Sequence, residues 1–345
     1  MSVRPPLEIG LIAYPGSQEA ALHGLSDNFQ VAQRLAQERR SISTPLLTVS
    51  RYTLDEQRAN VVPMSNSVGG AGSGVPDVVI APPCLGALPE RESIVPIAGW
   101  LKERHAAGSV VASVCAGAFL LAEAGLLDGR TATTHWTYAN MLAKAYPAVT
   151  LDIDKLVIDD GDIITAGGVM AWTDLSLKII GNILGSAAMI ETARFLLIDP
   201  PGREQRNYSA FSPVLTHGDG AILKVQQWLQ SVEVRKLTVD MMAEQAGLAE
   251  RTFIRRFEKA TGLRPTEYRQ NIRMDQAREL LGSSEHSIEQ IAWMVGYDDV
   301  SAFRKVFLKT TGLSPAFYRK KFAAIPAAEI PSDTESDDIG VSHGR

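Results

Sequence analysis

Two stretches in the last third of the chain repeat one another, and this repeat constrains the fold more than any other feature of the sequence. The small, aromatic and turn-forming residues of the first stretch recur 49 positions later up to a central glycine and 50 positions later beyond it. The matched positions are Ala243, Gly247, Phe253, Phe257, Thr261, Gly262, Pro265, Tyr268 and Arg269 in the first copy, and Ala292, Gly296, Phe303, Phe307, Thr311, Gly312, Pro315, Tyr318 and Arg319 in the second. The second copy therefore has one additional residue inside its turn. A duplicated unit of this kind predicts two similar small folds, one after the other.

Each copy is predicted to form a short helix, a tight turn and a second helix. The central glycine tolerates the left-handed backbone that lets two consecutive helices cross steeply. In the second copy, Ser287 and Gln290 have capping-box spacing, and Asp299 can cap the second helix. The matching cap position of the first copy is Ala249, which has no side-chain oxygen. We expect that helix start to be less rigid.

The paired phenylalanines divide the second helix of each copy into a buried face and an outward face. Residues four apart lie on the same side of a helix, so the opposite side points outward. The outward residues are Arg251, Thr252 and Arg255 in the first copy, and Val300, Ser301, Arg304 and Lys305 in the second. Arginine and lysine donate to guanine O6 and N7 or to phosphates, and valine and threonine methyl groups contact the thymine methyl. The alternative is that these cations only solvate a helical bundle, but two matching copies favour double-stranded DNA as the partner.

A single helix is predicted between the two copies, from Glu267 to Leu281. At 1.5 Å per residue this helix is roughly 22 Å long. As a rigid spacer it can hold two reading helices one DNA turn apart, about 34 Å.

The repeat resembles the AraC/XylS family of transcription regulators. The resemblance covers Leu223–Phe322 and is carried by Ala243-x-x-x-Gly247, Arg256-Phe257, Thr261-Gly262-x-x-Pro265 and their second copies. It implies that the second helices of the two copies enter successive major grooves on one face of the DNA, and that the outward residues named above read the bases.

The charge of the chain is divided unevenly, which matters because charges act on a ligand where they face it. The net charge is −5 overall, but residues 1–219 sum to −6, residues 220–324 to +5 and residues 325–345 to −4. A basic segment between an acidic domain and an acidic tail is expected if the repeat region is the part that contacts phosphates.

Apolar strand-like runs alternate with amphipathic segments in the first half of the chain. The strand-like runs are Ile9–Tyr14, Leu46–Val49, Val78–Ala81, Val110–Val114 and Ile163–Ala166, and helical patterns cover Phe29–Arg39, Asp174–Gly185 and Ala187–Leu197. This alternation predicts a parallel sheet covered by helices. The expected fold class is a doubly wound, flavodoxin-like α/β domain followed by an all-α domain with two helix-turn-helix units.

Composition predicts the domain boundaries. We expect an α/β domain over residues 1–198, a polar linker over 199–220, the helical domain over 221–323 and a disordered acidic tail over 324–345. Ser65–Pro76 contains the run Gly-Gly-Ala-Gly-Ser-Gly and is predicted to be a flexible surface loop. The sequence shows neither a signal-peptide core nor an apolar run long enough to span a membrane, so we expect a cytoplasmic protein with no membrane partner.

Cys115 stands at the turn between a predicted strand and a predicted helix, in the run Val110-Val-Ala-Ser-Val-Cys115-Ala-Gly117. Amide groups at a helix N-terminus stabilise a thiolate and lower its pKa, so such a turn can hold a nucleophile. The alternative is a small buried cysteine with a structural role. Cys84 and Cys115 are the two cysteines of a chain without a secretory signal, so no disulfide is expected. The six histidines lack partners at metal-ligand spacing, and neither a metal nor a cofactor is expected.

The segment Leu126-Leu-Asp-Gly-Arg130-x-x-Thr133-Thr134-His135-Trp136 follows Cys115, and together they resemble the ThiJ/PfpI-like superfamily, also called class I glutamine-amidotransferase-like. The resemblance implies that an acidic side chain after the first strand flanks the cysteine, and Asp27 lies at the matching place. Asp27, Cys115, His135 and Asp174 are therefore the candidate ligand-pocket residues. His135 can instead be a hydrogen-bonded structural histidine, and Asp174 can instead pair locally or cap its helix.

Two departures from the superfamily pattern bear on catalysis. Pro83 stands where a glycine commonly supplies a backbone amide to an oxyanion pocket, and proline has no N–H to donate. Trp172 stands where a small residue is usual, and its ring can fill space that a substrate needs. Both departures favour a sensing domain without turnover.

In one chain the two resemblances are those of GlxA-type regulators, which sense small, often nitrogen-containing metabolites. The expected function is a sequence-specific DNA-binding transcription regulator that responds to such a metabolite bound by the N-terminal domain. The alternatives are a cysteine-dependent hydrolase or hydratase and a redox sensor, both using Cys115. Besides DNA and the small-molecule effector, a second copy of the chain and RNA polymerase are the expected partners.

Overall fold

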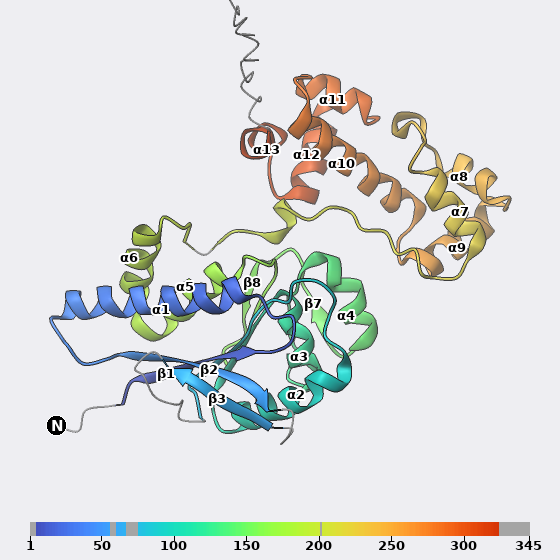
Figure 1. Ribbon diagram of the computed structural model, residues 1–345. Coiled ribbons are helices and arrows are strands. Elements are labelled where there is room, and N and C mark those ends of the chain that lie inside the picture. The colour runs from blue at the N-terminus through green and yellow to red at the C-terminus, as the bar shows by residue number, and fades with distance from the viewer. Residues whose placement is uncertain (1–4, 56–59, 67–74, 201, 324–345) are drawn as a thin grey trace, which may run out of the picture. The chain divides into compact units, whose positions relative to one another are not determined.

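The computed structural model describes residues 5–55, 60–66, 75–200 and 202–323. The predicted acidic tail, residues 324–345, lies outside the described residues, as do residues 67–74 of the predicted Ser65–Pro76 loop. The chain forms two compact units that divide between Val214 and Leu215 (Figure 1). Each unit is described by itself.

The first unit is built on a seven-stranded sheet with the strand order β3-β2-β1-β4-β5-β9-β8. The strands are β1 Leu7–Ala13, β2 Leu47–Asp55, β3 Asn60–Asn66, β4 Val78–Ala81, β5 Val110–Val114, β8 Val157–Asp159 and β9 Ile163–Ala166. The five central strands are parallel, and β3 and β8 pair antiparallel at the two edges. A separate parallel pair consists of β6 (Thr131–Ala132) and β7 (Thr150–Leu151). The predicted parallel sheet is confirmed, and the edge strands are additional to the prediction.

Helices cover the two faces of this sheet. On one face α1 (Glu19–Arg40), α5 (Trp172–Leu184) and α6 (Ser186–Leu196) pack against one another (Figure 1). On the other face α2 (Arg91–Ala106) packs against α3 (Ala118–Glu123), and α4 (Ala139–Ala145) follows in the chain. The strand order reverses beside β1, and right-handed crossovers that run in opposite directions place their helices on opposite faces. The doubly wound fold class is thereby confirmed.

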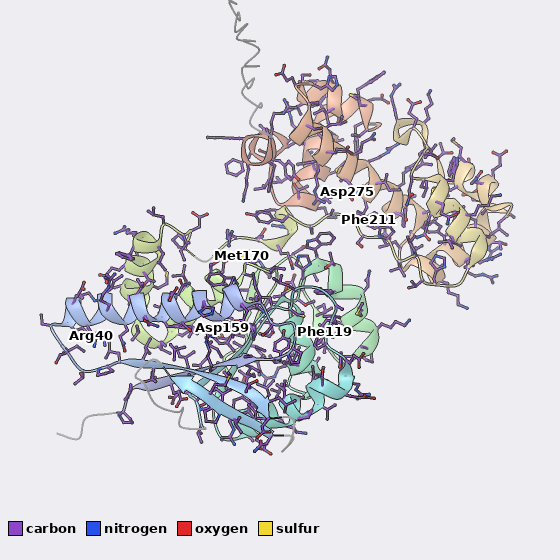
Figure 2. All side chains as sticks on the ribbon, in the orientation of Figure 1. Arg40, Phe119, Asp159, Met170, Phe211 and Asp275 are labelled. Carbon is purple, nitrogen blue, oxygen red and sulfur yellow. The ribbon has the colours of Figure 1, made fainter. Side chains whose placement is uncertain are left out.

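Side chains fill the space between the sheet and its helices, as Figure 2 shows, with Phe119 inside this core. Phe119 is 8% exposed and meets the rings of Tyr138 and Tyr146 edge to face, with centroids 6.1 and 6.4 Å apart. Because the carboxyl ends of parallel strands meet at one edge of a sheet, the segments that follow β1, β4, β5 and β9 gather there. Cys115 follows β5 and therefore lies at this edge.

The second unit consists of helices in two groups joined by α10 (Pro265–Ser283). The first group is α7 Gly220–Trp228, α8 Val239–Ala246 and α9 Glu250–Thr261, and the second is α11 Ile288–Met294, α12 Val300–Thr311 and α13 Pro315–Phe322. The predicted spacer is thus a helix somewhat longer than Glu267–Leu281. No helix in the described part of the chain has the length and apolar character needed to cross a bilayer.

The two copies of the repeat have matching aromatic cores. In the first, the Phe253 and Phe257 centroids are 5.2 Å apart, and Tyr268 lies 5.1 Å from Phe257, edge to face. The corresponding distances in the second copy, between Phe303, Phe307 and Tyr318, are 5.6 and 5.4 Å. The four phenylalanine side chains are fully buried. The inward direction of the paired phenylalanines is confirmed, and it leaves the opposite faces of α9 and α12 pointing outward.

The helix starts follow the predicted caps. The hydroxyl of Ser287 accepts from the amide of Gln290, whose side chain accepts from the Ser287 amide, which completes a capping box. Asp299 accepts from the amide of Ser301 at 2.8 Å and caps α12. Ala249 occupies the cap position of α9 without a side-chain hydrogen bond, as predicted.

Candidate functional site

The outward face of α9 presents two arginines to solvent. Arg251 and Arg255 are exposed, and Thr252 between them is partly buried. Within the described residues, neither guanidinium has an ion-pair or hydrogen-bond partner, so their donors are available to a ligand. Arg256, one position further, is engaged instead, since it donates to both carboxylate oxygens of Asp219 at 2.7 and 2.9 Å. That pair joins the start of α7 to α9.

The outward face of α12 presents the matching set of the second copy. Ser301, Arg304 and Lys305 are exposed, and Val300 is partly buried at the first position of the helix. Arg304 donates to the carboxylate of Glu289 on α11 at 3.0 Å, in a pair whose side chains are both more than half exposed. An exposed pair of this kind contributes little to stability, so Arg304 can exchange Glu289 for a phosphate or a base at small cost.

Cys115 occupies a strained turn at the carboxyl end of β5. Its φ is +54°, in the left-handed region that side chains seldom adopt. The following turn is packed closely, because a Cβ added to Gly117 would come within 2.4 Å of the carbonyl oxygen of Ala81. The predicted strand, sharp turn and helix are thus present, with Cys115 at the bend.

Burial governs the chemistry of the Cys115 thiol. The residue is fully buried, and this burial raises the pKa of the thiol to about 12, although a hydrogen bond from the Ala116 amide lowers it. The expected activation by helix N-terminal amides is therefore outweighed by the loss of solvent. A thiol with this pKa is protonated at neutral pH and is a weak nucleophile.

The side chain of His135 makes its hydrogen bonds within the adjoining turn. Its Nδ1 accepts from the amide of Thr137 at 3.2 Å, and it lies 2.7 Å from the Thr137 hydroxyl. Burial lowers the pKa of His135, which favours the neutral ring. Among the described residues no hydrogen bond joins His135 to Cys115, so the two do not form a nucleophile and base pair in this arrangement.

Gln18 is the N-cap residue of α1 and Asp27 lies within the same helix, and the two residues differ in burial. Asp27 is exposed on the helix, and none of its contacts within the described ranges is with Cys115. Gln18 is 7% exposed, and its backbone amide donates to the Pro83 carbonyl at 2.7 Å. The side-chain oxygen Oε1 of Gln18 has no hydrogen-bond partner among the described atoms. The buried polar side chain that follows β1 is therefore Gln18, which the sequence analysis did not select. Its position two residues after the Tyr14-Pro15-Gly16 turn was the available signal.

Asp174 is buried and paired with an arginine from far along the chain. Arg203 binds both of its carboxylate oxygens, with 3.1 Å between Nε and Oδ1 and a shorter contact through Nη2. Asp174 is 2% exposed, so this pair supplies most of its charge compensation. Nearby, the Trp172 ring packs on α1, where a Cβ on Gly24 would meet it at 2.3 Å. The expectation of a local partner or a helix cap was therefore wrong as to the partner, because Arg203 lies 29 positions away in the sequence.

Arg203 belongs to a segment that we call the strap, residues 202–209. Gln205 at its centre is 2% exposed, and its Nε2 donates to the carbonyl oxygens of Thr134 and Ile153, both at 2.9 Å. Its Oε1 accepts from the amide of Trp136 at 3.1 Å. The sequence analysis placed these residues in a linker over 199–220, but the strap packs on the α/β unit because its polar side chains satisfy buried backbone groups.

A cavity of about 390 Å³ opens where the strap crosses the body of the α/β unit. Its lining residues are Lys155, Leu156, Val157, Asp159, Asp174, Lys178, Gly202, Arg203 and Glu204. Asp159, labelled in Figure 2, is one of them and accepts from Lys178 at 2.9 Å. The cavity brings Asp174 together with the strap and leaves Cys115 and His135 outside its lining. In the part of the chain that the structure describes, no cluster of three His, Cys, Asp or Glu side chains is placed to hold a metal.

Comparison with known proteins identifies both units. The profile of the DJ-1/PfpI family matches residues 36–182, and a helix-turn-helix domain profile matches residues 242–321. The HTH-type transcriptional regulator GlxA of Rhizobium meliloti is 30% identical over 217 residues, which are 62% of this chain and 66% of that relative. The chain thus spans just under two thirds of that relative's length.

Two further relatives differ in the part of the chain that they cover. The HTH-type transcriptional regulator CdhR of Pseudomonas aeruginosa is 25% identical over 298 residues, 83% of this chain and 85% of the relative. Isonitrile hydratase of Pseudomonas putida is 32% identical over 121 residues, 35% of this chain and 49% of that enzyme. The chain thus joins a domain of the DJ-1/PfpI family to a helix-turn-helix domain of the AraC type.

Proposed function

We propose that this protein is a transcription regulator that binds specific DNA through α9 and α12 and binds a small-molecule effector through its α/β domain. The observation that carries the proposal is that α9 and α12 each bury a pair of phenylalanines on one face and therefore point the opposite face outward. Arg251 and Arg255 on one face, and Arg304 and Lys305 on the other, supply donors for bases and phosphates. The relatives that span most of the chain are HTH-type regulators, which supports this class of function.

Binding to DNA is tested with the full chain and duplexes from its own upstream region. The proposal predicts tighter binding to a duplex from this region than to a random duplex at moderate salt, with affinity that falls steeply as salt rises. Equal affinity for both duplexes would contradict sequence-specific regulation.

We infer that the α/β domain senses its ligand without turnover. The protonated Cys115 thiol and the engagement of His135 with Thr137 support this role, because a cysteine hydrolase needs a thiolate and a base in contact. A Cys115→Ala variant is expected to retain regulation of its promoter. Loss of a chemical activity with DNA control unchanged would instead support the hydrolase or hydratase alternative.

The effector that we propose is a small nitrogen-containing metabolite. Amino acids, betaines and related amines are the probes, each added to the full chain in a thermal unfolding experiment. A ligand that binds the folded state raises the apparent midpoint by mass action. An absence of any shift across the panel would contradict this effector class and leave the DNA test unaffected.

The strap gives the effector domain a direct connection to the reader. It is held by Thr134, whose hydroxyl also bonds to Cys115, and by Asp174. We propose that the connection between the two domains is residues 210–218, shorter than the linker expected from composition. Pairing of two copies and contact with RNA polymerase belong to the same proposal, and light scattering and transcription with purified polymerase test them.

A further inference from the structure

Two equivalent arginines of the repeat have the same structural role. Arg269, in the first copy, donates to the carbonyl of Leu237 at 3.1 Å, and Arg319, in the second, donates to the carbonyl of His286 at 2.5 Å. Each carbonyl belongs to the residue just before the N-cap of the first helix in its own copy. These arginines therefore stabilise each helix-turn-helix unit separately.

Arg273 makes a different kind of contact, because it joins the two copies. It lies one turn after Arg269 on α10, and the matching position of the second copy is Ala323. Its Nη1 donates to the carbonyl of Gly296, in the turn of the second copy, at 3.2 Å. Its Nη2 donates to the carbonyl of Arg235, in the segment before the first copy, at 3.3 Å. One guanidinium thus bonds at once to the turn of the second copy and to the segment that leads into the first copy.

Gly296, at this contact, has no room for a side chain, whereas Gly247, the equivalent glycine of the first copy, does. A Cβ on Gly296 would lie 2.7 Å from Nη2 of Arg273 and 3.2 Å from the Arg235 carbonyl oxygen. A Cβ on Gly247, the equivalent turn glycine of the first copy, would meet nothing within 4 Å. Both glycines have positive φ, of +87° and +66°, so they share the backbone requirement and differ in the guanidinium beside them.

A ring contact joins the same two segments. The Arg235 guanidinium lies over the Trp293 ring, 3.9 Å from its centroid, and Trp293 belongs to α11 of the second copy. Burial lowers the pKa of Arg273, in keeping with a guanidinium that is held against backbone rather than left in water. Figure 1 shows α10 running between the two helix groups, so these contacts add a second connection besides that helix.

We propose that Arg273 is a positioning residue that fixes the angle and distance between α9 and α12, and so makes the protein select one spacing between its two DNA contact segments. The proposal rests on the DNA-binding function proposed above. One inserted base pair rotates the second segment by about 34° and moves it about 3.4 Å along the duplex. A reader with a fixed angle cannot follow that change, whereas two units joined by α10 alone can adjust to it.

The test uses the full chain and a duplex selected for wild-type binding, together with the same duplex carrying one inserted base pair between the contacted segments. We expect wild type to bind the inserted duplex at least about tenfold more weakly, the equivalent of losing one good base contact. Arg273→Lys keeps the charge but not the planar two-carbonyl fork, so this ratio should fall below about threefold. The slope of affinity against salt should stay that of wild type, because no phosphate contact is removed.

Gly296→Ala and Gly247→Ala are matched variants at the equivalent turn glycines of the two copies, and both leave the net charge of the protein unchanged. Both place a side chain at positive φ, but Gly296→Ala also displaces the Arg273 guanidinium. We expect Gly296→Ala to lose the spacing preference and Gly247→Ala to keep it, with the folded fraction of each variant measured by thermal unfolding.

Different results would refute the DNA-binding function and the positioning role of Arg273. A wild-type chain that binds the selected and random duplexes equally would refute the DNA-binding function. A wild-type chain that selects its duplex, beside Arg273→Lys and Gly296→Ala variants that keep the wild-type spacing ratio, would refute the positioning role of Arg273 and leave the function standing.

Discussion

The hydroxyl of Thr134 donates a 2.8 Å hydrogen bond to the carbonyl of Cys115, the residue whose backbone is strained to positive φ. Thr134 is itself fully buried, and its own carbonyl accepts from Gln205 of the strap. The bend that holds the cysteine is thus tied to the strap through one residue. The cysteine at this bend is fully buried.

The first prediction concerns the reactivity of Cys115. Its pKa of about 12 leaves roughly a thousandth of the thiolate that an ordinary cysteine has at pH 8, and the residue is fully buried. Although a more basic thiolate is intrinsically more reactive, alkylation by iodoacetamide should be at least about tenfold slower than that of glutathione. Mass spectrometry of the modified peptide measures the rate, and the unfolded chain in denaturant is the control. Labelling of the folded protein as fast as that of glutathione would show that the thiol is accessible and ionised.

The same pKa shift predicts weaker folding at alkaline pH. The folded thiol keeps its proton up to about pH 12, whereas the unfolded thiol loses it near its ordinary value of 9.0. The stabilisation is therefore complete below pH 9 and is lost as the pH rises towards 12. Denaturant unfolding should show a smaller decline over this range for Cys115→Ala than for wild type, and equal declines would contradict the shift.

A further prediction concerns the buried ion pair of the strap. Arg203→Met leaves the Asp174 carboxylate buried without its partner, which should lower the free energy of unfolding by about 3 kcal/mol. Replacing both residues by apolar ones should recover much of the loss. The control is Glu233→Gln, which breaks the exposed pair with Lys236 and should change stability by less than about 1 kcal/mol. Equal effects of Arg203→Met and Glu233→Gln would show that the strap is not held by this pair.

Neighbouring glycines provide another prediction. A Cβ on Gly167 would lie 2.8 Å from the Gln205 amide, whereas one on Gly168 would meet nothing within 4 Å. Gly167→Ala should therefore displace the strap, lower the free energy of unfolding by about 1–3 kcal/mol and expose residues 202–209 to protease. Gly168→Ala should leave both unchanged. A strap that stays protected in Gly167→Ala would show that Gln205 does not anchor it.

The sequence predicted what depends on periodicity and on a repeated pattern. The five central strands were found because parallel strands buried on both faces form short apolar runs between turn residues. The paired phenylalanines and the caps at Ser287 and Asp299 were found because helix faces and caps depend on local spacing. The edge strands were missed because Pro63 interrupts the apolar run of β3 and because β8 is only three residues long.

The polar contacts between distant segments were the part that the sequence could not predict. Arg203 and Asp174 are 29 positions apart and Gln205 and Thr134 are 71 apart, and no periodic pattern connects them. A polar stretch looks like a linker until its hydrogen-bond partners are known, so the strap was included in the linker predicted over residues 199–220. The same reason applies to Gln18, whose burial depends on where the ends of β1 and β4 meet.

Binding of the full chain to its selected duplex as a function of salt, compared between Arg251→Ala/Arg255→Ala and wild type, tests the central claim most directly. The control, Arg39→Ala/Arg91→Ala, removes the same charge from the α/β domain. We predict that the α9 double variant loses at least about tenfold in affinity for the selected duplex, while the control binds like wild type. Wild-type affinity in the α9 double variant, or an equal loss in the control, would contradict recognition of DNA by this helix face.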